Sequence, residues 1–545
     1  MILAIPLVLS AFTYLWNPLG FPSLHIDEGH YMRKAMSILD GTGIDPLARY
    51  AAPYFGQIFL AGALGIVGYP DSLNLSANGD VHSIEALYLV PRVLIGLLAI
   101  LDTFLVYKIA ERRYNSNRTI ALIASILFAV MPITWVLRKI LLESLLLPLL
   151  LLSILLALYT SKDQIRRNYN SNKWRIIIIK NKNIPLVLLS GIFLGLAILT
   201  KIPIFTMIPL VGYLVYTSTN KNWKIVGLWL IPVILIPLSW PVDAIFNGDF
   251  DLWLKDVIWN TNRQNNNNSA VGGTLFASLK YLFQIEPVLL ILGFAGIFFA
   301  EIKRDFLILL WVVPFLVFFF IINFVSFFHL IPLLPAFCIA AARMIVDMSS
   351  RINHKNIQQI MPFAIISGIS VFGIVTITML ITTNVTSTYF KIYASVVQYL
   401  RNERATDHNN YNNFNDNNNI ITMIGRHWTR GLYWIPKYVY NIDLDFKKID
   451  KVNNIPLSVE GEKVIILVDN TLELSLSDYN NETSNGRRRQ LNLYYNTIPI
   501  ATFNNKSTHY DLDKYPYASM SENRDTKWIE IRANTDSSKI LWDIH

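Results

Sequence analysis

The chain has 545 residues, of which 53% are hydrophobic and only 16% are charged. Soluble domains carry about 25% charged residues, so the composition argues against a single soluble globule. The net charge of +9 arises entirely within residues 1–383, because residues 384–545 hold 19 basic and 19 acidic side chains. Basic residues among apolar segments normally report membrane orientation, which disfavours nucleic acid as a partner.

Uninterrupted apolar runs near the membrane-crossing length of about 20 residues predict a mainly α-helical, polytopic membrane protein. The first run has neither a basic n-region nor an A-x-A-like cleavage site, so we interpret it as a span rather than a signal peptide. We place about eleven spans at residues 2–19, 86–110, 118–137, 143–160, 185–200, 203–218, 225–240, 287–301, 306–322, 329–346 and 360–382.

The loops on alternate sides of these spans differ in charge. Those with most of the basic residues, 17 Lys and Arg in all, are 111–118, 161–184, 219–224, 302–305 and 343–359. The positive-inside rule assigns them to the cytoplasm. Loops 20–85 and 241–286 and the tail from residue 384 then lie outside. We therefore expect a multi-pass protein of the cell membrane, with a cytoplasmic N-terminus and an external C-terminal domain.

The polar tail has its own organisation. A predicted helix, Tyr393–Arg404, precedes the Asn-rich stretch Asn409–Asn419, which has too little apolar area to form a core and is typical of a linker. Short β-like runs follow at Ile420–Ile424 and Val464–Val468. We predict three parts: a membrane domain at 1–383, a helix and linker at 384–419, and a small external α/β domain at 420–545.

Two adjacent carboxylates follow the first span, within the sequence HIDEGHY of residues 25–31. The apolar spacing after them predicts a helix, with Asp27 and Glu28 at its N-terminal end. A carboxylate partly desolvated at the membrane surface has a raised pKa and can accept a proton from an incoming hydroxyl. A phosphate leaving group departs as an anion and needs no acid partner. The structural alternative is that Asp27 caps the helix and Glu28 complements its dipole.

Asp27-Glu28 with Tyr31 in the first external loop, together with segments 92–110, 138–148, 195–203 and 329–343, resembles the type C membrane glycosyltransferases. The similarity is greatest to the branch of protein O-mannosyltransferases and lipid A aminoarabinose transferases. It implies inverting transfer of a sugar, such as mannose or another hexose, from a polyprenyl- or dolichyl-phosphate donor to an acceptor hydroxyl on a protein, glycan or lipid. Asp27 would be the general base, with Glu28 as its companion and Tyr31 beside the substrate.

Basic residues on the predicted external face of the membrane, or inside a membrane span, suggest an anionic ligand such as the headgroup of a polyprenyl phosphate. They are Arg92, Arg138, Lys139 and Lys201. Structural alternatives stay open for each. Arg92 would pair with Asp102 only if the helix bends, because ten residues separate them by about 15 Å. Arg138 or Lys139 would pair with Glu143, and Lys201 would extend toward the interface.

The resemblance also marks Glu143 as a second acidic residue and His329 as a polar residue before a Pro-rich turn, both on the substrate side. The alternatives are a helix-end carboxylate and an interfacial histidine. Some type C enzymes use a divalent cation, and histidines with carboxylates suit zinc or manganese. No pair of histidines at i, i+4 spacing supports such a site in the acidic motif. The metal therefore remains an open possibility.

Two other classes of function remain open from the sequence. A transporter or flippase for a lipid-linked or anionic substrate would line its path with Arg92 and Asp102, although no internal repeat is visible. A non-catalytic scaffold would use the membrane lipids only as an anchor and present the tail as a binding module. Cleavage of a lipid-phosphate sugar would separate the enzyme from both.

Overall fold

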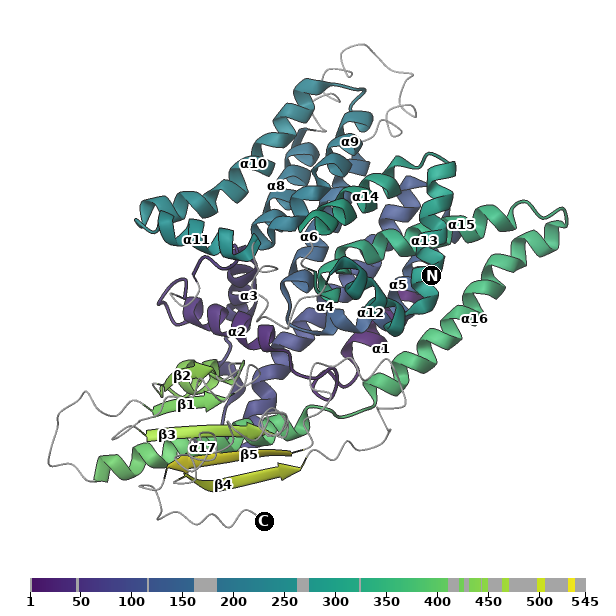
Figure 1. Ribbon diagram of the computed structural model, residues 1–545. Helices are drawn as coiled ribbons and strands as arrows, with labels where there is room; N and C mark the ends of the chain where they lie inside the picture. The colour runs from purple at the N-terminus through teal and green to yellow at the C-terminus, as the bar shows by residue number, and fades with distance from the viewer. Residues whose placement is uncertain are drawn as a thin grey trace, which may run out of the picture. The chain divides into compact units, whose positions relative to one another are not determined.

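A computed structural model gives the fold of the chain, which is mainly helical with a small C-terminal sheet, as predicted (Figure 1). The structure describes residues 2–45, 49–114, 117–160, 184–261, 274–322, 325–409, 421–425, 431–442, 444–448, 463–469, 497–504 and 528–534. Most of the predicted cytoplasmic loop 161–184 and of the Asn-rich linker lies outside the described residues.

The first half of the chain is built from α1 (Ala4–Leu15), α2 (Ile26–Leu39), α3 (Phe55–Ile66), η1 (Asp71–Leu73), α4 (Val81–Arg113), α5 (Arg118–Val130), η2 (Pro132–Arg138), α6 (Leu142–Tyr159), α8 (Ile184–Thr200), η5 (Ile202–Met207), α9 (Ile208–Ser218) and α10 (Trp223–Phe246). The next helices are α11 (Phe250–Thr261), α12 (Leu275–Ile285), α13 (Pro287–Ile302), α14 (Phe306–Ile322), η7 (Phe327–Leu333), α15 (Leu334–Ser349), α16 (Lys355–Ile381) and α17 (Ser387–Asn409). The tail adds β1 (Ile421–Gly425), η9 (Ile435–Val439), β2 (Leu444–Lys448), β3 (Lys463–Asp469), β4 (Thr497–Asn504) and β5 (Trp528–Asn534).

Within the described residues, five helical segments are long and apolar enough to cross a membrane, and they are α4, α6, α10, η7 with α15, and α16. The pair α5 and η2 passes the same test together but is bent by 68°. Pro132 explains the bend, because proline lacks an N–H and disfavours the helical conformation of the preceding residue; Met131 is extended. Seven shorter apolar helices accompany these. The chain is a multi-pass membrane protein, and the count of eleven spans stays a prediction.

The chain forms two compact units. The first comprises residues 1–16, 46–59 and 93–380, and the second comprises 17–45, 60–92 and 381–545. The second unit thus joins the tail to residues 17–45 and 60–92, most of which belong to the predicted first external loop, whereas the sequence pattern placed boundaries at residues 383 and 419. Contacts hundreds of residues apart create this grouping, and they leave no trace in local composition.

Helices of the first unit approach closely where small residues face each other. A Cβ added to Gly191 or Gly195 of α8 would lie 2.5 Å from the carbonyl oxygen of Trp229 and 2.7 Å from that of Pro232 on α10, so only glycine permits this packing. Hydroxyl pairs also join the helices. Ser153 of α6 donates to the carbonyl of Ser190 of α8 at 2.8 Å, and Ser190 donates back to that of Ser153 at 2.9 Å.

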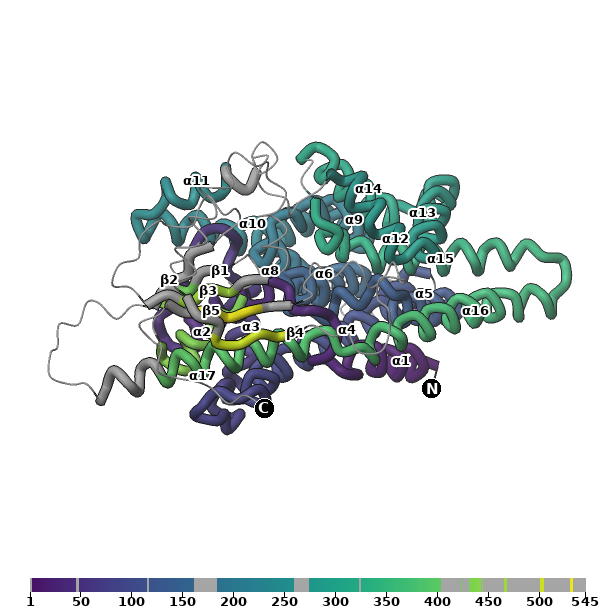
Figure 2. Tube along the Cα trace, turned by 60° about the horizontal axis from the view of Figure 1, so that its bottom comes forward, coloured from purple at the N-terminus to yellow at the C-terminus, as the bar shows by residue number. Residues whose placement is uncertain are grey.

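The second unit contains a five-stranded sheet in the order β2-β1-β3-β5-β4. β1 pairs in parallel with β2 and β3, and β5 pairs antiparallel with β3 and β4, with an irregularity between Pro499 and Ala501. Helix α17 packs against β4 and β5, as Figures 1 and 2 show. β1 and β3 fall on the two predicted β-like runs, and α17 extends the predicted helix at both ends.

The loop before α2 is held by the chain segment that precedes α17. The Asn17 amide donates to the carbonyls of Ile381 and Thr383 at 2.9 and 3.0 Å. The Val385 N–H donates to the carbonyl of Gly20 at 2.9 Å. These bonds fix the point from which the chain enters α2, and α2 carries the acidic motif.

Candidate functional site

Helix α2 begins with a capping box. His25 is the N-cap, and its Nδ1 accepts the N–H of Asp27 at 3.1 Å. Glu28 returns the bond, because its Oε2 accepts the N–H of His25 at 2.8 Å. The structural alternative in which Asp27 caps the helix is therefore wrong. The spacing of a capping residue and a glutamate three positions on could have revealed this, but the usual rule looks for Ser or Thr rather than His.

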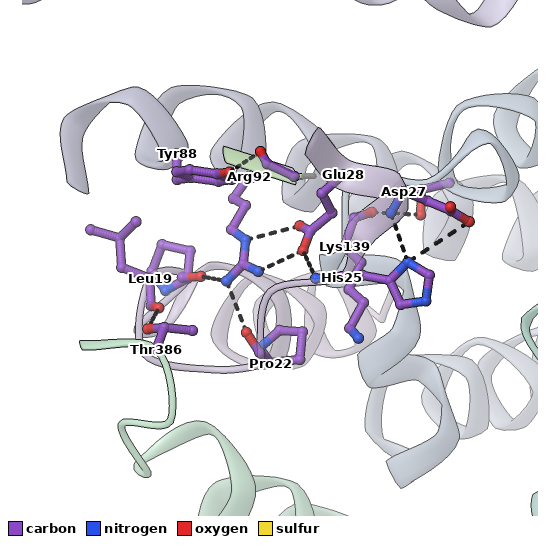
Figure 3. A network of polar contacts seen from close by, with 12 residues as sticks. Leu19, Pro22, His25, Asp27, Glu28, Tyr88, Arg92, Lys139 and Thr386 are labelled. Carbon is purple, nitrogen blue, oxygen red and sulfur yellow. Dashed lines mark hydrogen bonds and ion pairs between the residues drawn. The ribbon is translucent and has the colours of Figure 1, made fainter. Parts of the chain in front are cut away.

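Glu28 is fully buried and forms an ion pair with Arg92 of α4 (Figure 3). The Arg92 Nε donates to Oε1 at 3.1 Å, and its Nη2 donates to Oε2 at 2.9 Å. Its Nη1 donates to the carbonyls of Pro18 and Pro22 at 2.9 and 3.0 Å. Arg92 thus holds Glu28 and the loop before α2, and this use of its donors argues against its predicted phosphate contact.

Asp27 differs from its neighbour, because its side chain is 31% exposed while that of Glu28 is fully buried. The His25 Nδ1 lies 3.8 Å from the Asp27 Oδ2. Since Nδ1 already accepts a backbone N–H, it carries no proton, and His25 is a neutral neighbour rather than a counter-charge. Tyr31 follows Asp27 by one helical turn, on the same face of α2, and is half-buried. The solvent-accessible carboxylate of the motif is therefore Asp27.

The rest of α2 is more deeply buried than an interfacial helix with a polar outer face. Arg33 and Lys34 are both buried, and the Arg33 Nε forms an ion pair with Asp45. The apolar spacing identified the helix, but it did not reveal that Asp45 in the following loop would bind Arg33.

A second cluster of predicted residues lies in the first unit, where three elements bring together Glu143 of α6, Lys201 between α8 and η5, and His329 of η7. The Lys201 Nζ donates to Glu143 Oε1, and the His329 Nε2 lies 4.0 Å from the same oxygen. Glu143 is buried, and its Oε2 has no hydrogen-bond partner among the described residues. Lys201 and His329 keep 21% and 15% of their side chains exposed.

Aromatic rings frame this cluster. The Lys201 Nζ lies 5.5 Å from the centre of the Phe328 ring, and His329 stacks on Phe319 with ring centres 5.9 Å apart. The Ser326 N–H donates to the His329 Nδ1 at 3.1 Å, so the proton of neutral His329 sits on Nε2, the atom nearest Glu143. No sequence pattern predicts that Phe319 and Phe328 lie here, because apolar rings are common in membrane segments.

Arg138 and Lys139 lie at the end of the bent segment η2, and both are buried. Arg138 donates to the carbonyl of Trp16, and the Lys139 Nζ lies 5.3 Å from the centre of the Trp135 ring. Trp135 in turn contacts Phe327 of η7, with ring centres 6.4 Å apart. η2 and η7 are therefore neighbours, and Lys139 belongs to the surroundings of the Lys201 cluster.

Asp102 is not the partner of Arg92. It is buried in α4, and neither of its carboxylate oxygens has a hydrogen-bond partner among the described residues. Among those residues, no group of three or more His, Cys, Asp and Glu side chains is arranged to hold a metal ion. A surface cavity of about 310 Å³ at the junction of α10 and α11, lined by Ile245, Gly248, Phe250 and Asp251, contains none of the predicted site residues.

Comparison with known proteins places this geometry in context. Residues 4–245 match the family model of dolichyl-phosphate-mannose-protein mannosyltransferases. No curated protein matches the sequence. The structure resembles the oligosaccharyltransferase AglB from Archaeoglobus fulgidus, solved with an inhibitory peptide and a dolichol-phosphate, at 13% identity and a TM-score of 0.54 over 87% of this chain and 69% of that one.

The apo form of the same Archaeoglobus fulgidus enzyme gives 13% identity and a TM-score of 0.54 over 93% of this chain and 73% of that one. ArnT from Cupriavidus metallidurans bound to undecaprenyl phosphate gives 13% identity and a TM-score of 0.49 over 99% and 98% of the two chains.

Proposed function

We propose that this chain is a type C membrane glycosyltransferase with a polyprenyl-phosphate-linked donor, and that it transfers mannose or another hexose to an acceptor hydroxyl on the external face of the membrane. The match of residues 4–245 to the family model of dolichyl-phosphate-mannose-protein mannosyltransferases supports this proposal. The acceptor is a protein, glycan or lipid hydroxyl. The observation that carries the assignment of its base is the contrast between two adjacent carboxylates, one fully buried and ion-paired and the other 31% exposed.

In the proposed reaction, the acceptor oxygen attacks the anomeric carbon of the donor sugar, and Asp27 takes the hydroxyl proton. The bond between the anomeric carbon and the phosphate oxygen breaks, and its electron pair leaves with the lipid phosphate. The configuration at the anomeric carbon inverts. Glu28, held by Arg92, positions Asp27 through the first turn of α2 rather than reacting itself.

The departing phosphate needs positive charge where its own charge develops. Among the predicted basic residues with a described contact, Lys201 has the most exposed side chain. Its ammonium supplies this charge, and His329 lies beside it. Arg138 and Lys139 add buried charge at the end of η2. We assign the lipid-phosphate headgroup to these four residues, with Glu143 holding Lys201 before the donor binds.

The test uses the purified full-length protein in lipid nanodiscs, a radiolabelled polyprenyl-phosphate mannose and a hydroxyl-bearing acceptor. Asp27→Asn should lower turnover by about 10²- to 10⁴-fold, the usual contribution of a general base, while donor binding persists. Asp40→Asn is the matched control, because Asp40 is exposed at the other end of α2. Full turnover by Asp27→Asn would falsify the base assignment. If the wild-type protein moves the donor across the membrane without transferring its sugar, the transporter class is favoured instead.

A further inference from the structure

The segment Gly431–Ile442 lies far along the chain from the acidic motif but is buried in the same unit. Residues from Gly431 to Pro436 are all buried, and Trp434 has no exposed surface. The segment continues into η9, one turn of π-helix, which is rare in proteins and frequent at functional sites. Helices α2 and α17 both contact η9.

The first contact of this segment is with α2, directly beside Glu28. A Cβ added to Gly29 would lie 2.3 Å from both the Cα and the carbonyl oxygen of Gly431, so the two backbones touch. The contact is asymmetric. A Cβ added to Gly431 would find its nearest neighbour, the carbonyl oxygen of Ile26, at an ordinary 3.8 Å.

The second contact is with α4, one turn before Arg92. Tyr88 is buried, and its hydroxyl donates to the carbonyl of Gly431 at 3.4 Å. Its ring meets that of Trp434 edge-on, with centres 5.8 Å apart. The same segment therefore touches both α2 and α4. Glu28 of α2 and Arg92 of α4 form the ion pair drawn in Figure 3.

We propose that Gly431 and Trp434 are positioning residues that set the first turn of α2 against α4 and so fix the direction of the Asp27 carboxylate. Neither residue reacts. Gly431 sets the distance of α2 by backbone contact, and Trp434 holds Tyr88, and with it the α4 turn that carries Arg92. This inference rests on the proposed function, because it assigns the C-terminal segment a role in the reaction of Asp27.

The first test uses the close contact between Gly29 and the backbone of Gly431. Gly29→Ala forces α2 away from Gly431, and since a misplacement of about 1 Å can cost about 100-fold in rate, kcat should fall by that order. Gly62→Ala, in α3 with no atom within 4 Å of the added Cβ, is the matched control and should keep the wild-type kcat.

Trp434→Ala should lower kcat while KM for the lipid-phosphate donor stays unchanged, and Trp434→Phe should restore most of the rate. Binding of polyprenyl phosphate, measured on every variant, reports whether the protein is folded. A KM change without a kcat change, or wild-type kcat for both Gly29→Ala and Trp434→Ala, overturns the inference. Failure of the proposed function looks different, because Asp27→Asn would then retain turnover whatever Gly29→Ala does.

Discussion

Arg92 holds both carboxylate oxygens of Glu28, at 3.1 Å from Nε and 2.9 Å from Nη2, although 64 positions separate the two residues. Both side chains are fully buried. The bidentate geometry fixes the plane of the carboxylate, and the capping bond to His25 uses the same Oε2. Glu28 therefore has a structural role, and Asp27 is the carboxylate of the motif that is available for the reaction.

Removing the charge of Glu28 should destabilise the protein. Glu28→Gln leaves Arg92 buried without a counter-charge, and breaking a buried pair by removing one partner costs about 3–5 kcal/mol. We expect thermal unfolding in detergent to occur at a clearly lower temperature for Glu28→Gln than for Asp27→Asn. The double variant Glu28→Gln with Arg92→Met removes both charges and should recover part of the loss. Equal unfolding temperatures for the two single variants would contradict the structural role of the pair.

Lys201 should determine donor affinity. A hydrogen bond to a charged group contributes about 1.5–3 kcal/mol, so its loss should raise KM for the donor by roughly 10- to 100-fold. Lys201→Met alone would leave Glu143 buried and unpaired. The informative comparison is therefore Glu143→Gln against Glu143→Gln with Lys201→Met, because the two differ only in the ammonium. Identical KM values for these variants would exclude Lys201 from the phosphate contact.

Asp305 should make the stability of the protein change with pH in the acid range. It lies between α13 and α14, buried, with Arg113 at 2.9 Å, Arg343 in contact and the Tyr114 hydroxyl donating at 2.7 Å. Burial alone would raise its pKa, but the charges of Arg113 and Arg343 and the Tyr114 hydrogen bond lower the pKa below its ordinary 3.8. A depressed carboxyl pKa contributes stability that is present above 3.8 and is lost as pH falls through the folded value.

Asp305→Asn should accordingly lower the unfolding temperature at neutral pH, and the difference from wild type should shrink as the pH falls below 3.8. Scanning fluorimetry of both proteins between neutral and acid pH measures it. Asp347→Asn is the comparison, because Asp347 also approaches Arg343 but keeps 33% of its side chain exposed. A difference that stays constant down to the lowest pH would contradict the ionised state of Asp305.

Glu286 should make stability depend on pH in the opposite direction from Asp305, so that stability falls as pH rises. Burial raises its pKa from 4.5 to about 7, although backbone N–H groups of Leu289, Val288 and Ile133 oppose the rise. A raised carboxyl pKa means stability that is full below 4.5 and is lost as pH rises through about 7. Glu286→Gln should unfold at a higher temperature than wild type above pH 7, with a gap that closes toward pH 4.5. A gap independent of pH would contradict this assignment.

The sequence predicted the parts of the fold that local pattern controls. Apolar runs identified the membrane helices, and the spacing after Glu28 identified α2. The resemblance to type C enzymes drew attention to Glu143 and His329, and basic charge on the predicted outside drew attention to Lys201. The structure brings these three residues together. Their convergence depends on the packing of segments from three parts of the chain, which composition alone does not reveal.

Long-range partners were beyond sequence reasoning. Position within one helix offers Asp102 as a partner for Arg92, whereas the structure pairs Arg92 with Glu28 of another helix. Residue Gly431 gave no signal at all. A glycine is informative only when the backbone it approaches is known, and the backbone near Gly431 is that of Gly29, about 400 positions earlier.

The capping box at His25 shares its carboxylate with the ion pair of Arg92, and this has a dynamic consequence. Helix ends ordinarily fray, with amide protons that exchange quickly with solvent. Here the opening of the first turn of α2 would separate Glu28 from the buried Arg92 guanidinium, so local opening has a high free-energy cost. The amide proton of His25 should therefore exchange only when much of its unit unfolds.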